Sequence, residues 1–178
     1  MRISLRPVTL DDGETIVKWK NSKNVISHSF NKNKITVESN IKFYKDNIVT
    51  GKYKQFIVER LDEDYGAFSY DIATVYLKDI DNYNNRCELC VFTSDDGEWN
   101  DEAKSQAIRM LLDMAFNEYG MHKVYSYVFS EFLDEAELLK KAGFRAESIL
   151  CEEAKNIHGE FTDVIRFSVY KESFDTIA

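Results

Sequence analysis

Proline, glycine and cysteine are all scarce in this chain of 178 residues. It has one proline, seven glycines and three cysteines. Without a proline- or glycine-rich stretch there is no sign of a linker, and we find no internal repeat, so we predict a single domain over residues 1–178. A domain of this length buries about 70% of its unfolded surface, so its core needs neither a disulfide nor a metal for stability.

Long hydrophobic runs and an excess of basic residues are also missing. The apolar runs are too short to span a bilayer, and the N-terminus lacks the apolar block of a signal peptide, so we expect no membrane partner. Lys and Arg number 23 against 31 Asp and Glu, a formal charge of −8, which argues against a nucleic-acid partner. The odd number of cysteines fits a reducing compartment, so we predict a cytoplasmic protein.

Two of the cysteines, Cys87 and Cys90, form a C-x-x-C pair. A structural zinc site needs four ligands, and no second C-x-x-C or H-x-x-H follows. Both cysteines lie in a strand-like run, where an offset of three points side chains to opposite faces. We therefore predict no metal site and interpret both as small apolar strand residues.

Hydrophobic periodicity predicts elements in the order β-α-α-β-β-β-α-β-α-β-β. The predicted strands are 3–8, 55–59, 72–77, 87–93, 124–129, 144–150 and 161–170. The predicted helices are 11–20, 36–47, 101–119 and 134–141, with a loop containing a helical turn at 21–34 and turns at 61–66 and 81–85. The helix over 101–119 has the strongest pattern, with Asn100 as its N-cap and Gly120 at its end. This order indicates an α/β fold with a mixed sheet.

Segments spread over nearly the whole chain together resemble the GNAT superfamily of acyl-CoA-dependent N-acetyltransferases. The likeness is closest to the branch that holds ribosomal-protein N-terminal and sugar-nucleotide N-acetyltransferases. The similar segments are 5–8, 19–21, 72–81, 86–92, 107–116, 122–125, 140–144 and 158–164. The resemblance implies a single GNAT-like domain whose central sheet is mixed, mostly antiparallel, flanked by helices, and splayed between two parallel strands, here 87–93 and 124–129.

The resemblance also implies that acetyl-CoA is a co-substrate and lies in that splay. Its pantetheine arm would run along 89–93, and its pyrophosphate would sit at the start of the helix 101–119. Helix starts carry unpaired N–H donors and a positive dipole end, which favour an anion. The implied cofactor-binding residues are Leu89, Val91, Phe92, Thr93, Asn100, Asp101, Glu102, Ala103, Lys104 and Ser105.

The pyrophosphate loop departs from the family pattern. Where this branch commonly has W-G-x-G-x-G/A, residues 99–104 have the sequence W-N-D-E-A-K, so both glycines are replaced. Two carboxylates, Asp101 and Glu102, each repel a bound phosphate by about 1 kcal/mol in water at contact distance, and Lys104 offsets one of these charges. The same residues also form a favourable helix start, so a purely structural role for them stays open.

Two further positions bear on catalysis. Glu88 resembles the strand glutamate of the branch, which implies a general base that accepts the proton of an incoming ammonium directly or through water. The alternative is a strand carboxylate paired with Arg86 or with solvent. The family tyrosine that protonates the leaving thiolate falls on Leu139, and leucine cannot transfer a proton.

Two functions therefore remain. The first is an N-acetyltransferase, acting as a monomer or homodimer on a primary amine: a small molecule, an amino sugar or a protein N-terminus. The second is a GNAT-fold protein that has lost catalysis and serves as a binding or assembly module. Family membership favours the first, and the altered loop and missing tyrosine favour the second.

Overall fold

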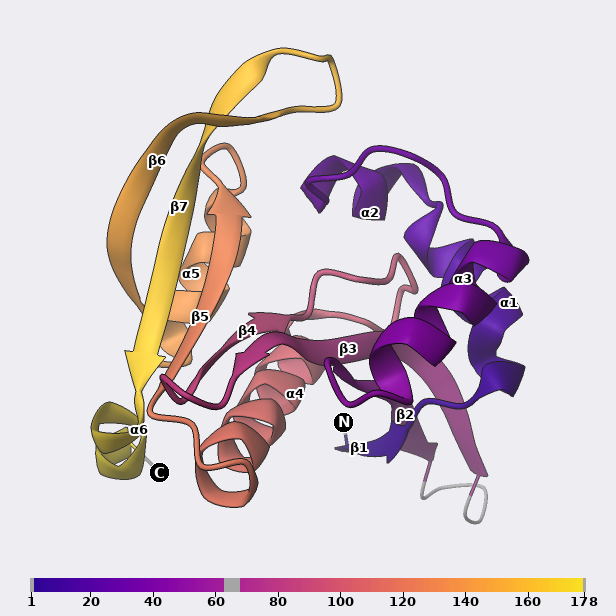
Figure 1. The fold of residues 1–178 in the computed structure, drawn as a ribbon, viewed down its shortest axis with the longest axis horizontal. Helices are drawn as coiled ribbons and strands as arrows, with labels where there is room; N and C mark the ends of the chain where they lie inside the picture. The colour runs from indigo at the N-terminus through magenta and orange to yellow at the C-terminus, as the bar shows by residue number, and fades with distance from the viewer. Residues whose placement is uncertain (1, 63–67, 178) are drawn as a thin grey trace.

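A computed structural model describes residues 2–62 and 68–177. Its strands form one seven-stranded sheet in the order β1-β2-β3-β4-β5-β7-β6 (Figure 1). The strands are β1 (Arg2–Pro7), β2 (Lys54–Asp62), β3 (Phe68–Asp81), β4 (Arg86–Cys90), β5 (Lys123–Phe129), β6 (Arg145–Lys155) and β7 (Phe161–Tyr170). The α-helices are α1 (Gly13–Lys20), α2 (Lys23–His28), α3 (Val37–Phe43), α4 (Asp101–Asp113), α5 (Leu133–Lys141) and α6 (Lys171–Ile177). Shorter helical turns are η1 (Leu10–Asp12), η2 (Tyr44–Ile48) and η3 (Met114–Glu118).

The sheet is antiparallel except between β4 and β5. That parallel ladder is short, running from the pair Arg86–Lys123 to the pair Glu88–Tyr125. Beyond it the two strands separate, and β5, β6 and β7 diverge from β1–β4 (Figure 1). The predicted α/β fold, with a mostly antiparallel sheet splayed between two parallel strands, is confirmed.

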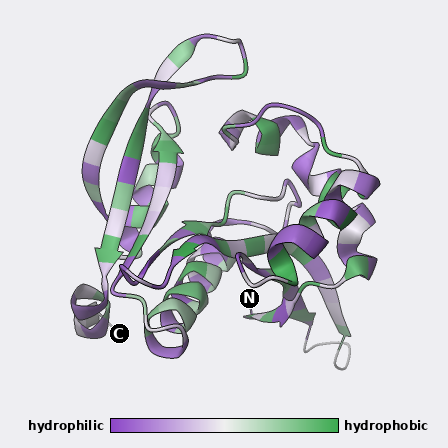
Figure 2. Ribbon diagram, in the orientation of Figure 1, coloured by the Kyte–Doolittle hydropathy of each residue, from purple (hydrophilic) through white to green (hydrophobic). Residues whose placement is uncertain are grey.

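The core lies between the sheet and α4. Hydrophobic and hydrophilic residues alternate along this helix (Figure 2), and its buried side chains recur at the helical period. These buried residues are Ala103, Ala107, Ile108, Leu111 and Leu112. The helix continues as the short π-helix η3. Gly120 follows at a φ of 67°, a left-handed conformation that glycine adopts at little cost. The predicted helix at 101–119 is thus confirmed, and its last turn is a π-helix rather than an α-helix.

The most consequential difference from the sequence prediction is the end of β4. The strand was expected to continue to Thr93, but it ends at Cys90. Beyond Glu88 it has lost its partner β5. On the β3 side the hydroxyls of Thr93 and Ser94 donate to the carbonyls of Thr74 and Ile72, so side chains hold the segment that follows β4 in place.

Smaller differences concern the ends of the chain and the turns. The helix α6 is absent from the sequence prediction. The helical turn predicted within the loop at 21–34 is the short helix α2. Most of the predicted turn at 61–66 lies outside the described residues. None of the described helices has the length and apolar character needed to cross a membrane.

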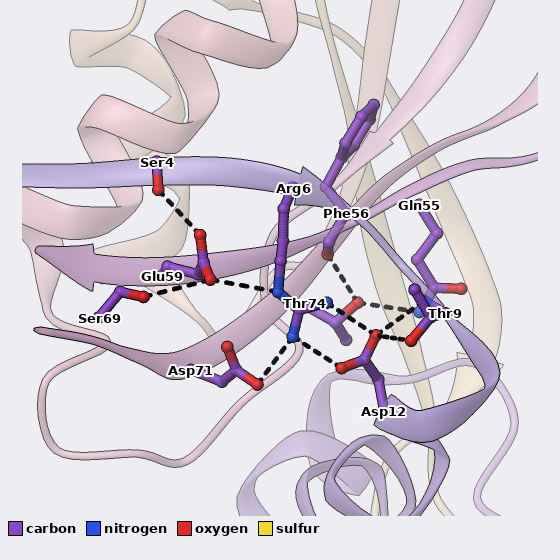
Figure 3. A network of polar contacts seen from close by, with 10 residues as sticks. All are labelled: Ser4, Arg6, Thr9, Asp12, Gln55, Phe56, Glu59, Ser69, Asp71 and Thr74. Atoms are coloured by element: carbon purple, nitrogen blue, oxygen red, sulfur yellow. Dashed lines mark hydrogen bonds and ion pairs between the residues drawn. The ribbon is translucent and has the colours of Figure 1, made fainter.

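A polar network fastens the N-terminal segment to the sheet (Figure 3). Arg6 on β1 donates two hydrogen bonds to Asp12, of 2.7 and 2.9 Å, and one of 2.9 Å to Asp71 on β3. Asp12 also accepts from the backbone N–H of Thr9 at 2.7 Å. Burial acts to raise the pKa of Asp12, but the bonds from Arg6 and Thr9 outweigh it and lower that pKa. We interpret this network as structural.

Candidate active site

A cavity of about 320 Å³ opens where β4 and β5 separate. Glu88, Cys90 and Phe92 line it from β4 and the segment that follows, and Ser126 and Tyr127 line it from β5. On its other side the lining comes from the N-terminal helices and the loop after them: Lys20, Val25, His28 and residues of 29–35. The N-terminal region therefore closes over the point at which the sheet splits.

Glu88 is the buried carboxylate of this cavity, with 5% of its surface exposed. The β3–β4 register places Lys78 opposite it, and the Lys78 Nζ lies 3.1 Å from the Glu88 Oε1. The Cys90 thiol also donates to Glu88 Oε1, at 3.4 Å. Burial raises the pKa of Glu88, while Lys78 acts to lower it, and burial prevails. A carboxylate whose pKa is raised toward neutrality is well matched to general-base chemistry.

The alternative partner considered for Glu88, Arg86, is not its partner. The Arg86 Nε donates to Asp81 at 3.2 Å, on the turn between β3 and β4. Glu88 is therefore paired, but with Lys78 inside the cavity. The pair keeps an ammonium beside the candidate base, which stabilises the carboxylate form.

The two cysteines of the C-x-x-C pair have different environments, as the strand pattern predicts. Cys87 lies in the hydrophobic core, and burial raises the pKa of its thiol to about 12. Cys90 lines the cavity, and burial, followed by the charge of Glu88, raises the pKa of its thiol as well. Across residues 2–62 and 68–177 the structure contains no group of three or more His, Cys, Asp or Glu placed to hold a metal ion.

The residues expected along the pantetheine arm lie together at this cavity. Its lining includes all four of them: Leu89, Val91, Phe92 and Thr93. The segment is held from outside the sheet, because the indole N–H of the buried Trp99 donates to the Val91 carbonyl at 3.0 Å. An extended segment without a strand partner on its β5 side offers backbone groups to a ligand entering the splay.

A second cavity, of about 620 Å³, lies at the start of α4 and shares Val25, His28 and Phe92 with the first. Its charged lining is dominated by carboxylates. These are Asp101 on α4 and, at or near the start of α5, Glu131, Asp134 and Glu135. Lys104 also lines it, with its Nζ 3.6 Å from the Asp101 Oδ1. The end of the splay expected to receive a pyrophosphate is therefore acidic.

Only some of the residues predicted to bind the pyrophosphate, 100–105, line this second cavity. The Asn100 side chain caps α4 by accepting from the Ala103 N–H at 3.1 Å, and Ala103 itself is buried in the core. Glu102 and Ser105 are exposed and are not among the lining residues of either cavity. Asp101 and Lys104 are thus the loop side chains that reach the site.

His28, the last residue of α2, contacts residues at and just before the start of α5. Its Nδ1 lies 2.6 Å from the Glu135 Oε1, and its ring centre lies 3.8 Å from that of Phe132. Burial raises the pKa of Glu135, with His28 acting in the opposite direction. The sequence assigns no role to either His28 or Lys20: His28 lies in a polar stretch without a motif, and Lys20 lies in the family-like segment 19–21, for which the resemblance implies no role.

Leu139, at the position of the family tyrosine, has no exposed surface and belongs to the hydrophobic core. It is not among the lining residues of either cavity. The hydroxyl and thiol groups that do line the first cavity belong to Tyr76, Cys90, Ser126 and Tyr127, together with Ser29 and Thr93.

In the described residues the mixed sheet opens between its parallel strands β4 and β5, with the buried carboxylate of Glu88 at the opening. This is the arrangement that the resemblance to the GNAT superfamily implies. Residues 2–145 match the family model described as an acetyltransferase (GNAT) domain. The chain belongs to this family, as the sequence resemblance predicts.

Similar proteins include the spermidine N(1)-acetyltransferase of Vibrio cholerae serotype O1 (strain ATCC 39315 / El Tor Inaba N16961). It is 23% identical over 173 residues, which cover 97% of this chain and 95% of that protein. The crystal structure of the Vibrio cholerae spermidine N-acetyltransferase with CoA and spermine superposes with a TM-score of 0.86, 23% identity and 97% coverage of each chain. A chimera of that enzyme and hSSAT gives a TM-score of 0.84 at 20% identity, covering 98% of each chain. At this identity the structural likeness concerns the fold.

Proposed function

We propose that the protein transfers the acetyl group of acetyl-CoA to the primary amine of a small molecule, with Glu88 as the general base. The observation that carries this proposal is the buried Glu88 carboxylate, with its raised pKa, at the point where the parallel strands separate. Membership of the acetyltransferase (GNAT) family supports it. So do the names of similar proteins, which act on spermidine, a small-molecule amine.

In this proposal the pantetheine arm follows residues 89–93, and the thioester reaches the first cavity. The acceptor amine loses a proton to Glu88, directly or through water, and its nitrogen forms a bond with the thioester carbonyl carbon. The carbon–sulfur bond then breaks, the amide nitrogen gives up its remaining extra proton to water, and the CoA thiolate takes a proton from water or from a hydroxyl or thiol of the cavity. Leu139 takes no part, because leucine has no proton to give.

The pyrophosphate of acetyl-CoA would bind at the start of α4 through backbone N–H groups of the first helical turn and the Lys104 ammonium. The Ala103 and Lys104 N–H groups are already bonded to the side chain and the carbonyl of Asn100. The carboxylates of the second cavity oppose this binding. The same acidity supports the second candidate function, a GNAT-fold module without catalysis, which would not need to hold two phosphates.

We also propose that the protein works in the cytoplasm, as a monomer or homodimer. Cys87, Cys90 and Cys151 are all free thiols, and Cys151 is exposed. A reducing compartment keeps such thiols unpaired.

The deciding experiment is calorimetric titration of the protein with acetyl-CoA, followed by measurement of CoA thiol release in the presence of small amines. Micromolar binding and amine-dependent release support the acetyltransferase. The Glu88→Gln variant should then bind acetyl-CoA as the parent does and lose about 10²–10⁴-fold in rate, the usual contribution of a placed base. No binding at millimolar acetyl-CoA would favour the non-catalytic module.

A further inference from the structure

The cavity that holds Glu88 also contains an ammonium group without a carboxylate partner. Lys20 is the last residue of α1 and lines this cavity. Its Nζ lies 5.0 Å from the ring centre of Tyr76 and 5.4 Å from that of Phe43. No carboxylate of the described residues lies within ion-pair distance of it, and burial is the main influence that lowers the pKa of Lys20.

The other charges of the cavity do not supply the missing partner. Glu88 is the one carboxylate among the described residues that line the cavity, and it is already paired with Lys78. That pair is close to neutral as a unit, so it does not compensate a positive charge on Lys20. Lys78 is also near enough to Lys20 to act on its pKa as a like charge. Lys20 is half-buried, and desolvating its ammonium without a counter-charge is costly, so a ligand that brings a negative charge would relieve that cost.

We propose that the acceptor is an amine that also carries an anionic group, a carboxylate or a phosphate, and that Lys20 binds this group while the amine faces Glu88. This proposal rests on the proposed acetyltransferase function and assigns its substrate class. An acceptor of this kind places its negative group against the unpaired ammonium and its amine against the carboxylate.

A polyamine has the opposite charge pattern. In the proposed function the pyrophosphate occupies the acidic second cavity, so the further ammonium groups of a polyamine would enter the first cavity. There Lys20 and Lys78 outnumber Glu88 among the described lining residues, and like charges at short distance repel in a site of low dielectric. The substrate class inferred for this protein therefore differs from the one named for the Vibrio cholerae enzymes, although the fold is shared.

The test uses pairs of amines that differ by one anionic group. Free lysine differs from cadaverine by a carboxylate, and glucosamine 6-phosphate differs from glucosamine by a phosphate. Spermidine represents the polyamines. We expect the anionic member of at least one pair to be preferred about tenfold or more in kcat/KM, measured as CoA thiol release, because a charge-assisted contact contributes about that much. The pair that shows the preference distinguishes carboxylate from phosphate.

Two variants test whether Lys20 is responsible. Lys20→Met removes the charge but retains the length of the side chain, and it should abolish the preference mainly through KM. Lys20→Glu should reverse it, so that cadaverine or glucosamine becomes the better acceptor. Lys18→Met is the matched control, because Lys18 is an exposed residue of the same helix. Thermal melts establish that each variant is folded.

The outcomes separate this inference from the proposed function. Equal rates within both pairs, or a wild-type preference for spermidine, would overturn the inference while the acetyltransferase stands. A loss of kcat for both members of a pair in Lys20→Met would also overturn it, because it would assign Lys20 to proton transfer. If no turnover is seen, calorimetric titration of the protein with the anionic amine alone, without acetyl-CoA, measures binding directly. Binding that is lost in Lys20→Met would then support the anion site and contradict the acetyltransferase. Absence of both binding and turnover would contradict both.

Discussion

Lys78 and Glu88 face each other across the β3–β4 ladder, with the Lys78 Nζ 3.1 Å from the Glu88 Oε1. The antiparallel register creates this pair between residues that share no sequence motif. It places a salt bridge at the point where the parallel strands part. Because Cys90 also donates to Glu88, the carboxylate has a fixed position in the cavity and a pKa set by burial against a neighbouring cation.

The first prediction concerns pH. If Glu88 is the base, kcat/KM should rise with pH through the pKa of Glu88, which lies above its ordinary value of 4.5. The deprotonated carboxylate is the active form, so activity is lost as the pH falls. The Glu88→Gln variant should lack this acidic limb, as measured from initial rates between pH 4.5 and 8. An identical limb in the variant would assign it to another group.

The second prediction concerns the acidic second cavity. The variant Asp101→Asn combined with Asp134→Asn should bind acetyl-CoA more tightly, roughly two- to fivefold, since each exposed charge contributes little in water. The gain should shrink as salt is added. Glu102→Gln is the control, because Glu102 is exposed and is not among the cavity's lining residues. Equal gains in the control and the double variant would contradict the placement of the pyrophosphate.

The third prediction concerns Leu139, which has no exposed surface. Leu139→Tyr should lower the free energy of unfolding by about 1–3 kcal/mol, because the core has no room for the larger ring. Turnover at saturating substrates should not rise in the folded variant. Leu133→Tyr, at an exposed position of the same helix, should leave stability nearly unchanged. A stable Leu139→Tyr variant with faster turnover would show that this position does reach the thiolate.

The fourth prediction concerns the network in Figure 3. Asp12→Asn should lower the free energy of unfolding by about 1–3 kcal/mol, because it removes a buried charged partner from Arg6. The lowered pKa of Asp12 sets the pH dependence. Its contribution is fully present above the ordinary value of 3.8 and is lost as the pH falls through the folded-state pKa.

Urea unfolding of wild type and variant at pH 7 and at pH 2.5 measures both effects, and the difference between them should shrink at the lower pH. Asp11→Asn is the control, because Asp11 is the exposed neighbour of Asp12. A difference that stays constant with pH would mean that the variant perturbs packing rather than the ion pair.

The sequence by itself determined the order of the strands and of the helices between them, but not the last helix α6, because hydrophobic periodicity is a local property. The last strand occupies 161–170 as predicted, and the helix expected at 101–119 occupies α4 and η3. The sequence also pointed to Glu88 as the candidate base and to Leu139 as a position without a proton donor. Each of these inferences depended on residues close together in the chain or on a family motif.

Only the tertiary structure decided which residues meet at the site. A periodic pattern reports which face of an element is buried, but not which side chain of another element lies opposite it. His28 belongs to no motif, and the family-like segment 19–21 does not by itself place Lys20 at a site; both residues reach the cavities only because α1 and α2 close over the splay. The end of β4 at Cys90 depends on the divergence of β5, a strand that begins more than thirty residues later. The charge of the first cavity therefore depends on the tertiary structure, and so does the substrate class inferred from it.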